Sequence, residues 1–118
     1  MGKDALAQAA VDIYSESRRV YAAIPELGRL RDDLIYGEVW QDPALSVRDR
    51  SLITCAMLAA LGRSSELQLH VGRAYQNGVN ADELRALAVH AAFYAGWPAA
   101  LALGRAALPV LEEDPGEG

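Results

Sequence analysis

The segment from Leu52 to Leu61, which reads LITCAMLAAL, constrains the fold more than any other part of the chain. Thr54 is its single polar residue, so a helix formed here is apolar on nearly every side. Such a helix must be covered by several neighbours, and a chain of 118 residues supplies few of them. We therefore expect part of this helix, or of the helices beside it, to be buried in an interface between copies of the chain.

The composition favours helices over strands. Ala and Leu supply 22 and 16 residues, against 12 for Val and Ile together. Ala and Leu are good helix formers, whereas β-branched residues prefer strands. The chain is also short for two ordinary domains. We therefore expect one all-α domain over residues 1–118, with short joints that favour antiparallel neighbours in a bundle.

Charge and segment pattern exclude several classes of partner. A net charge of −5 with no Lys/Arg block disfavours binding to nucleic acid or to an anionic bilayer. The N-terminus MGKDALAQAA lacks the apolar core of a signal peptide, and the single cysteine, Cys55, excludes an intrachain disulfide. The longest apolar stretch, residues 51–61, is far shorter than the roughly 20 residues of a membrane span. These features predict a cytoplasmic protein with no membrane partner.

Capping residues, prolines and glycines divide the chain into six expected helices. The first three are an amphipathic helix carrying Leu6, Ala10, Ile13, Val20 and Tyr21, a helix from Pro25 to Gly37 with a stripe of Leu27, Leu30 and Leu34, and a helix capped by Ser46 with Asp49 that ends at Gly62. The other three are a helix capped by Ser64 or Ser65 that ends at Asn77-Gly78, a helix capped by Asn80 with Glu83 that ends at Gly96, and a helix from Pro98 that Pro109 kinks or ends. Residues 37–46 should form a structured loop.

Glu66 and His70 are the first candidates for chemistry. They are four residues apart, so on a helix their side chains share a face and can share a proton. The alternative is a solvated surface pair, because most charged helical residues are exposed. The apolar residues around them favour partial burial, which shifts the proton affinity of a Glu beside a His into a useful range.

His90 and Tyr94 form a second pair with the same spacing, within the apolar run AVHAAFYAGW. The alternative for His90 is a core histidine satisfied by one hydrogen bond. Two histidines and one glutamate could in principle hold a metal, but there is no HExxH, no cysteine cluster and no repeated Glu-x-x-His. We therefore expect no metal.

Two arginines and two tryptophans are further candidates for binding. Arg48 and Arg50 lie where the third helix begins, and a guanidinium there could grip a small carboxylate, although Asp49 offers a surface ion pair instead. Trp40 and Trp97 are ordinarily core or interface residues but could wall a pocket. Cys55 is most simply a small buried apolar residue.

These residues fall in an ordered series of motifs: EVW at 38–40, RDRSLIT at 48–54, ALGRSSELQLH at 60–70, NGV at 77–79 and HAAFYAGWPAA at 90–100. The series resembles the carboxymuconolactone decarboxylase family, part of the AhpD-like superfamily, over about residues 36–107. The resemblance implies an all-helical protomer of about six helices, assembly into a homo-oligomeric ring, commonly a trimer or hexamer, and a pocket near the protomer interfaces.

The superfamily contains both peroxidases and decarboxylases. AhpD-like peroxidases carry Cys-x-x-Cys before a histidine that matches His70, and the two cysteine positions fall here at Arg63 and Glu66. Without those sulfurs this thiol chemistry is excluded. The Glu-Leu-x-x-His pattern resembles the decarboxylase branch, whose members convert γ-carboxymuconolactone into β-ketoadipate enol-lactone and carbon dioxide without a cofactor. One departure is Ala86, where family members commonly carry an acid.

The resemblance and the residues together suggest a role for each candidate. His70 would transfer the proton, Glu66 would fix its tautomer, and Arg50, with Arg48 beside it, would hold a substrate carboxylate. His90, Tyr94 and Trp97 would be wall residues. Two alternatives use the same residues: isomerisation, hydration or cyclisation of another small carbonyl compound, or a non-catalytic oligomeric binding module.

Overall fold

The computed structural model describes the backbone of residues 2–115, and the side chains in that range except those of residues 3 and 6–15. This part of the chain is all-helical, as expected, with six α-helices. The elements are α1 (Gly2–Ala23), α2 (Pro25–Leu30), the π-helical turn η1 (Arg31–Tyr36), the 3-10 turn η2 (Val39–Gln41), α3 (Val47–Ala60), α4 (Ser64–Gln76), α5 (Ala81–Tyr94) and α6 (Trp97–Glu113).

Several predicted helix ends are confirmed by their capping geometry. Ser46 caps α3, with its hydroxyl oxygen accepting a 3.0 Å hydrogen bond from the backbone N–H of Asp49. Asn80 and Glu83 form a full capping box at the start of α5. Gly62 and Gly78 follow α3 and α4 with φ of 72° and 103°, a conformation that favours glycine.

Other predicted details differ in the structure. The second helix changes to π-helical winding at Arg31, a change that the spacing of three leucines does not reveal. Neither Ser64 nor Ser65 caps α4, because the helix already begins at Ser64 and Arg63 holds the cap position without a side-chain bond. The fifth helix ends at Tyr94, since the turn through Gly96 has already begun. The predictions for Leu6, Ala10 and Ile13 fall on side chains outside the described residues.

The sixth helix runs through Pro109 and reaches Glu113. Proline in a helix interior removes the hydrogen bond to the carbonyl four residues earlier, here that of Arg105. Arg105 is exposed, so water can satisfy that carbonyl, while Val110 directly after the proline is buried in the core. Of the two expected effects of Pro109, the end of the helix is therefore wrong, and the kink stays a prediction.

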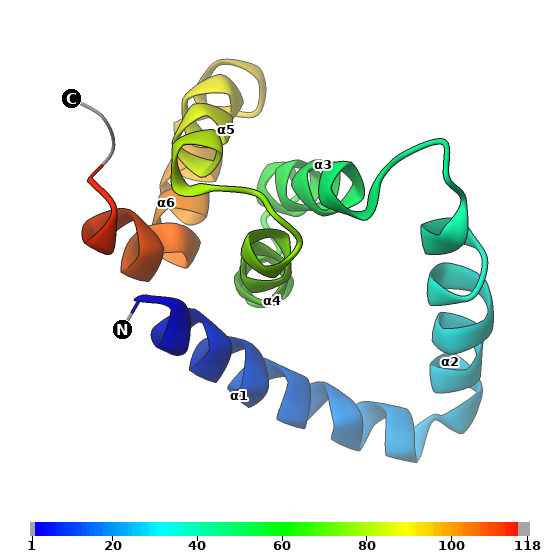
Figure 1. Ribbon diagram of the computed structural model, residues 1–118. Coiled ribbons are helices and arrows are strands. Elements are labelled where there is room, and N and C mark those ends of the chain that lie inside the picture. Colours follow the sequence, from blue (N-terminus) through cyan, green and yellow to red (C-terminus); the bar gives the residue numbers. More distant parts are fainter. Residues whose placement is uncertain (1, 116–118) are drawn as a thin grey trace.

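The core forms around α4, which packs against α1, α3 and α6, while α5 packs mainly against α6 (Figure 1). Its largest fully buried side chains are Leu67, Leu103, Val71 and Val79, with Cys55 and Ser51 beside them. The apolar third helix buries Ser51, Cys55 and Ala59. Ile53, Met57 and Leu61 of the same segment remain 39%, 60% and 71% exposed. One chain thus leaves part of its apolar helix uncovered.

Residues 2–46, which precede α3, form an arm. In Figure 1, α1 runs below α4 and α2 rises at the far end, before residues 37–46 lead back to α3. Residues 37–46 form the expected loop around η2. The elements α2, η1 and η2 contain no buried residue, and Leu27 and Leu34 of the predicted leucine stripe are each 46% exposed. Within residues 2–115, no helix has the length and apolar character needed to cross a bilayer.

Candidate functional site

One face of α4 carries a row of polar side chains. Glu66, His70, Arg73 and Asn77 are separated by four, three and four residues, so they lie one above another along the helix. The face of α4 that packs in the core carries the buried residues Leu67, Val71 and Ala74. The row faces partners on other elements: Arg73 contacts η1, and the Asn77 side-chain amide donates a 2.9 Å hydrogen bond to the buried hydroxyl of Ser51 on α3.

His70 is half-buried, and its Nδ1 atom is buried without a hydrogen-bond partner in the described part of the chain. Burial and, to a smaller extent, the charge of Arg73 lower the pKa of His70 to about 4, while Glu66 opposes both effects. The imidazole is therefore neutral at pH 7. Glu66 is exposed, and among the described side chains no hydrogen bond joins it to His70.

Arg50 provides the other unpartnered group. One of its terminal nitrogens donates a 3.0 Å hydrogen bond to the backbone carbonyl of Asp42, which fastens the loop before α3. Its Nε is buried without a partner. Among the described residues, His70 Nδ1 and Arg50 Nε are the two buried side-chain N or O atoms that lack a bond. Buried polar atoms are normally satisfied, so each of these atoms lacks a hydrogen bond that such an atom usually makes.

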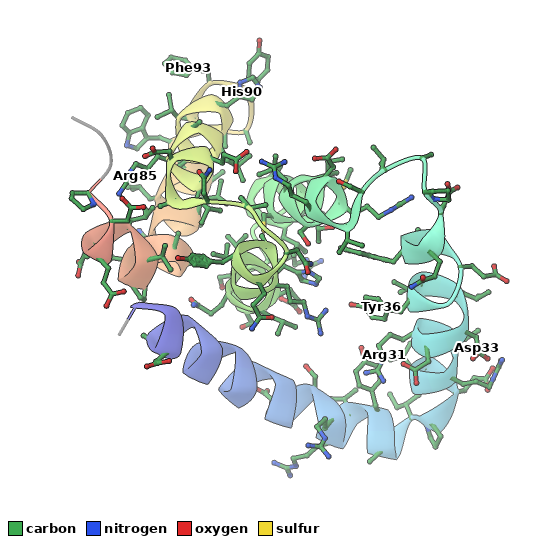
Figure 2. The ribbon with its side chains drawn as sticks, viewed as in Figure 1. Arg31, Asp33, Tyr36, Arg85, His90 and Phe93 are labelled. Carbon is green, nitrogen blue, oxygen red and sulfur yellow. The ribbon has the colours of Figure 1, made fainter. Side chains whose placement is uncertain are left out.

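A cavity of about 400 Å³ lies between the arm and the end of α4. Its lining includes Arg31, Tyr36 and Trp40 from the arm and Val47, Arg73 and Asn77 from the helices α3 and α4. Figure 2 shows Arg31 and Tyr36 directed from the arm toward α4, whereas Asp33 points to the outside. The cavity therefore begins at the polar row of α4, one turn from His70.

Arg73 is held at the wall of this cavity. Its guanidinium donates a 2.6 Å hydrogen bond to the Tyr36 hydroxyl and lies 5.6 Å from the centre of that ring. Tyr36 in turn contacts Trp40, with ring centres 5.9 Å apart. Arg31 is stacked over Tyr21 at 4.0 Å and bonds Asp32 at 2.9 Å. No carboxylate lies within ion-pair distance of Arg73 among the described residues.

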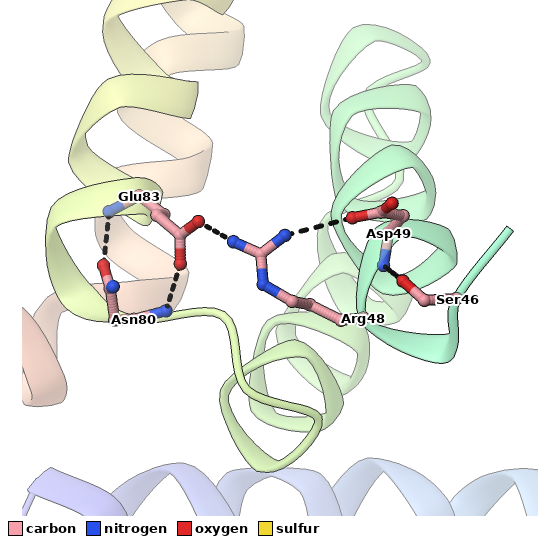
Figure 3. A network of polar contacts seen from close by, with 5 residues as sticks. All are labelled: Ser46, Arg48, Asp49, Asn80 and Glu83. Carbon is pink, nitrogen blue, oxygen red and sulfur yellow. Dashed lines mark hydrogen bonds and ion pairs between the residues drawn. The ribbon is translucent and has the colours of Figure 1, made fainter.

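Arg48, the predicted neighbour of Arg50 in substrate binding, is occupied by protein partners. Its guanidinium pairs with Glu83 of α5 and with Asp49, the latter at 3.0 Å (Figure 3). Glu83 is also the third helical residue of the capping box at the start of α5. Arg48 therefore connects the starts of α3 and α5.

His90 and Tyr94 lie on the outer face of α5. Their rings are stacked with centres 4.6 Å apart, and they border an open hollow of about 770 Å³ with Ala86, Val89 and Phe93. Figure 2 labels His90 and Phe93 on this part of α5. Tyr94 is 82% exposed and Phe93 80%. Trp97, at the start of α6, is 65% exposed. Neither this hollow nor the cavity at α4 is lined by His70.

The remaining predicted candidates are simpler. Cys55 is fully buried, and burial raises the pKa of its thiol to about 12, so it is not a nucleophile at neutral pH. Among the described residues, no group of three or more His, Cys, Asp or Glu side chains is placed to hold a metal ion.

Sequence reasoning missed Arg73, Tyr36 and Arg31. Arg73 was within reach, because it continues the helical spacing of Glu66 and His70. Tyr36 lies 37 residues before Arg73, and only the path of the arm brings the two together. Trp40 was considered as a pocket wall, and the structure places it in the cavity.

Comparisons with known proteins give a consistent result. The model of the carboxymuconolactone decarboxylase family matches residues 25–109. The 4-carboxymuconolactone decarboxylase of Acinetobacter baylyi is 46% identical over 78 residues, which cover 66% of this chain and 55% of that protein. The nitrosuccinic acid decarboxylase npaB of Metarhizium robertsii is 39% identical over 66 residues, which cover 56% of this chain and 46% of that protein. The chain thus spans about half the length of the curated relatives it matches.

Proposed function

Because the chain belongs to the carboxymuconolactone decarboxylase family, we propose that it is a cofactor-independent decarboxylase of a small carboxylated lactone, of the 4-carboxymuconolactone decarboxylase type. Both named relatives are decarboxylases, although their names give different substrates. In this proposal the reaction is a step in the degradation of aromatic compounds, and it takes place in the cytoplasm. We propose that residues 1–118 act as one domain.

The reaction itself sets the requirements for the site. The bond between the ring carbon and the departing carboxylate breaks, carbon dioxide leaves, and the electron pair moves into the conjugated lactone carbonyl. The resulting dienolate then takes up a proton on carbon. A site for this reaction needs donors that stabilise the delocalised charge and one group that delivers the proton.

The observation that carries the proposal is the pair of unpartnered buried atoms, His70 Nδ1 and Arg50 Nε. In our proposal His70 transfers the proton, and Arg50 uses its free N–H to hold a carboxylate of the substrate. Glu66, one turn before His70, sets the orientation of the imidazole once the substrate is bound. Arg48 acts indirectly, by fixing the start of α3 through Glu83.

A pKa of about 4 leaves His70 without a proton in the free protein at neutral pH. An anionic substrate changes this, because a carboxylate beside the imidazole favours its charged form. A carboxylate that pairs with Arg73 also removes the repulsion that Arg73 exerts on a protonated His70. Substrate binding therefore raises the pKa of His70, so that the imidazole takes up a proton from solvent and then delivers it to the dienolate.

We propose further that the outer face of α5 and α6 is covered by another copy of the chain in a homo-oligomeric ring, a trimer or a hexamer. Phe93, Tyr94 and Trp97 are large and mostly exposed, and apolar side chains grouped in this way favour an interaction surface. In such a ring His90, Tyr94 and Trp97 would form walls between protomers rather than within one. Met57 and Leu61 of α3 would be covered in the same way.

The direct test is to incubate the purified chain with γ-carboxymuconolactone and to measure released carbon dioxide together with the product by NMR. Stoichiometric carbon dioxide and an enol-lactone support the proposal. Conversion of the lactone without carbon dioxide supports the isomerase or hydratase alternative. No conversion of this lactone or of nitrosuccinate would argue for a binding module.

A further inference from the structure

The cavity between the arm and α4 contains two arginines, Arg31 and Arg73, against one exposed carboxylate, that of Asp32. Arg73 is half-buried, and in the described part of the chain it has a phenol as its side-chain partner and no acid. The chain as a whole is acidic, with a net charge of −5, so this positive cavity is not a general property of its surface.

The walls of the cavity favour a flat ligand. Tyr36 and Trp40 present two neighbouring rings, and Asn77 supplies an amide at the base. A volume of about 400 Å³ is in the usual range for small-ligand pockets. Arg31 and Tyr36 occupy the first and last positions of η1, the π-helical turn, and such turns are often found at functional sites. The unusual winding thus places both side chains on the cavity.

We propose that this cavity binds the carboxylate that the substrate keeps after decarboxylation, with Arg73 and Arg31 as its two anchors and Tyr36 and Trp40 as walls for the ring. The assignment rests on the proposed function, and it adds a second anion site to the one at Arg50. It implies a substrate with two carboxylates, one lost and one retained. Nitrosuccinic acid, named for one relative, has two carboxyl groups.

The position of Arg73 links binding to chemistry. Arg73 lies three residues after His70 on the same face of α4. A carboxylate held by Arg73 places the rest of a small lactone within a turn of the imidazole. The Tyr36 hydroxyl fixes one guanidinium nitrogen, so the other N–H groups remain free for a forked contact with both carboxylate oxygens. Arg73 is therefore a binding residue whose guanidinium is held in a defined orientation.

Binding can be measured without turnover. The probe is 2-(5-oxotetrahydrofuran-2-yl)acetate, a saturated lactone that carries only the retained side-chain carboxylate and has no ring carboxylate to lose as carbon dioxide, and its neutral methyl ester is the matched control. The chain has two tryptophans, of which Trp40 lines the cavity, so the part of the fluorescence quenching that is lost in Trp40→Phe reports on the cavity. Arg29→Gln is the matched control variant, because Arg29 is exposed and pairs with Glu26 and Asp33 outside the cavity.

We expect saturable quenching of Trp40 by the carboxylate and at least about tenfold weaker binding of the ester. In Arg73→Gln and in Arg31→Gln, the carboxylate should lose as much affinity as the ester does in the parent protein. Arg29→Gln should bind as the parent does. Equal binding of acid and ester, the absence of saturable quenching, or unchanged affinity in both cavity variants overturns the proposal. If Arg73→Gln does not fold, as judged by circular dichroism, Arg31→Gln decides alone, since α2 and η1 bury no residue.

The outcome is independent of the proposed reaction. Carboxylate binding that depends on Arg73, without release of carbon dioxide from any lactone, would contradict the proposed function and leave this site standing. Release of carbon dioxide that is insensitive to Arg73→Gln and Arg31→Gln would support the proposed function and contradict the carboxylate site.

Discussion

The guanidinium of Arg73 donates a 2.6 Å hydrogen bond to the hydroxyl of Tyr36, and this contact joins α4 to the arm. The two residues are 37 positions apart in the chain. One belongs to the polar row that contains His70, and the other to the π-helical turn η1. The contact therefore sets the width of the cavity and the direction of the arginine at the same time.

Tyr36→Phe should weaken substrate binding with little effect on the chemical step. The substitution keeps the ring wall but releases the guanidinium of Arg73, so we expect KM to rise about 3- to 10-fold while kcat changes less than twofold. Steady-state kinetics on the lactone measure both constants. Tyr75→Phe on α4 removes a hydroxyl outside the cavity and should change neither constant. A fall in kcat alone for Tyr36→Phe would contradict the positioning role.

His70 should make the protein less stable in mild acid. Its pKa is about 4 in the folded protein, against 6.5 for an ordinary histidine, so between these values the unfolded chain binds more protons and stability falls as pH drops. His70→Gln removes this loss. Urea unfolding at pH 7 and pH 4.5 should show an acid-induced loss smaller by about 2 kcal/mol in the variant. An identical loss in both proteins would mean that the folded imidazole titrates normally.

A charge on the outer face of α5 should dissociate the oligomer. Phe93 is 80% exposed in one chain, and Phe93→Glu would place a carboxylate in the interface that we propose there. Analytical ultracentrifugation should show a smaller species for this variant. Gln76→Glu adds the same charge at an exposed polar position and should leave the mass unchanged. A parent protein that is already monomeric at micromolar concentration would refute the interface.

The capping box at Asn80 should contribute to stability and not to chemistry. Its side chain accepts a 2.9 Å hydrogen bond from the Glu83 backbone, and Glu83 also pairs with Arg48. Asn80→Ala should lower the free energy of unfolding by about 1 kcal/mol, and Asn80→Gly by a few tenths. Denaturant titrations measure both values. A large loss of kcat in a folded Asn80→Ala protein would contradict a purely structural role.

Local signals predicted much of the fold. Ser46 with Asp49, Asn80 with Glu83, and the two glycines after α3 and α4 act over a few residues, so their effect can be read from the sequence. The π-helical turn and the passage of α6 through Pro109 could not, because both depend on packing with distant residues.

The candidate site was predicted in part for the same reason. Glu66 and His70 were predicted to share one helical face, because spacing alone reveals that relation, whereas Arg73 on the same face was missed. The approach of Tyr36 and Arg31 depends on how the arm returns to α4, which no local pattern encodes. His90 and Tyr94 do form a stacked pair, but they lie on a face that one chain leaves open.

The central claim is that His70 delivers the proton in a decarboxylation, and His70→Ala tests it most directly. Carbon dioxide release from γ-carboxymuconolactone should fall at least about a hundredfold in the folded variant, and added imidazole should restore part of it, because the substitution opens a space beside the substrate. Near-normal release by His70→Ala, or a loss that imidazole does not relieve in a protein that still binds the lactone carboxylate, would contradict the assignment.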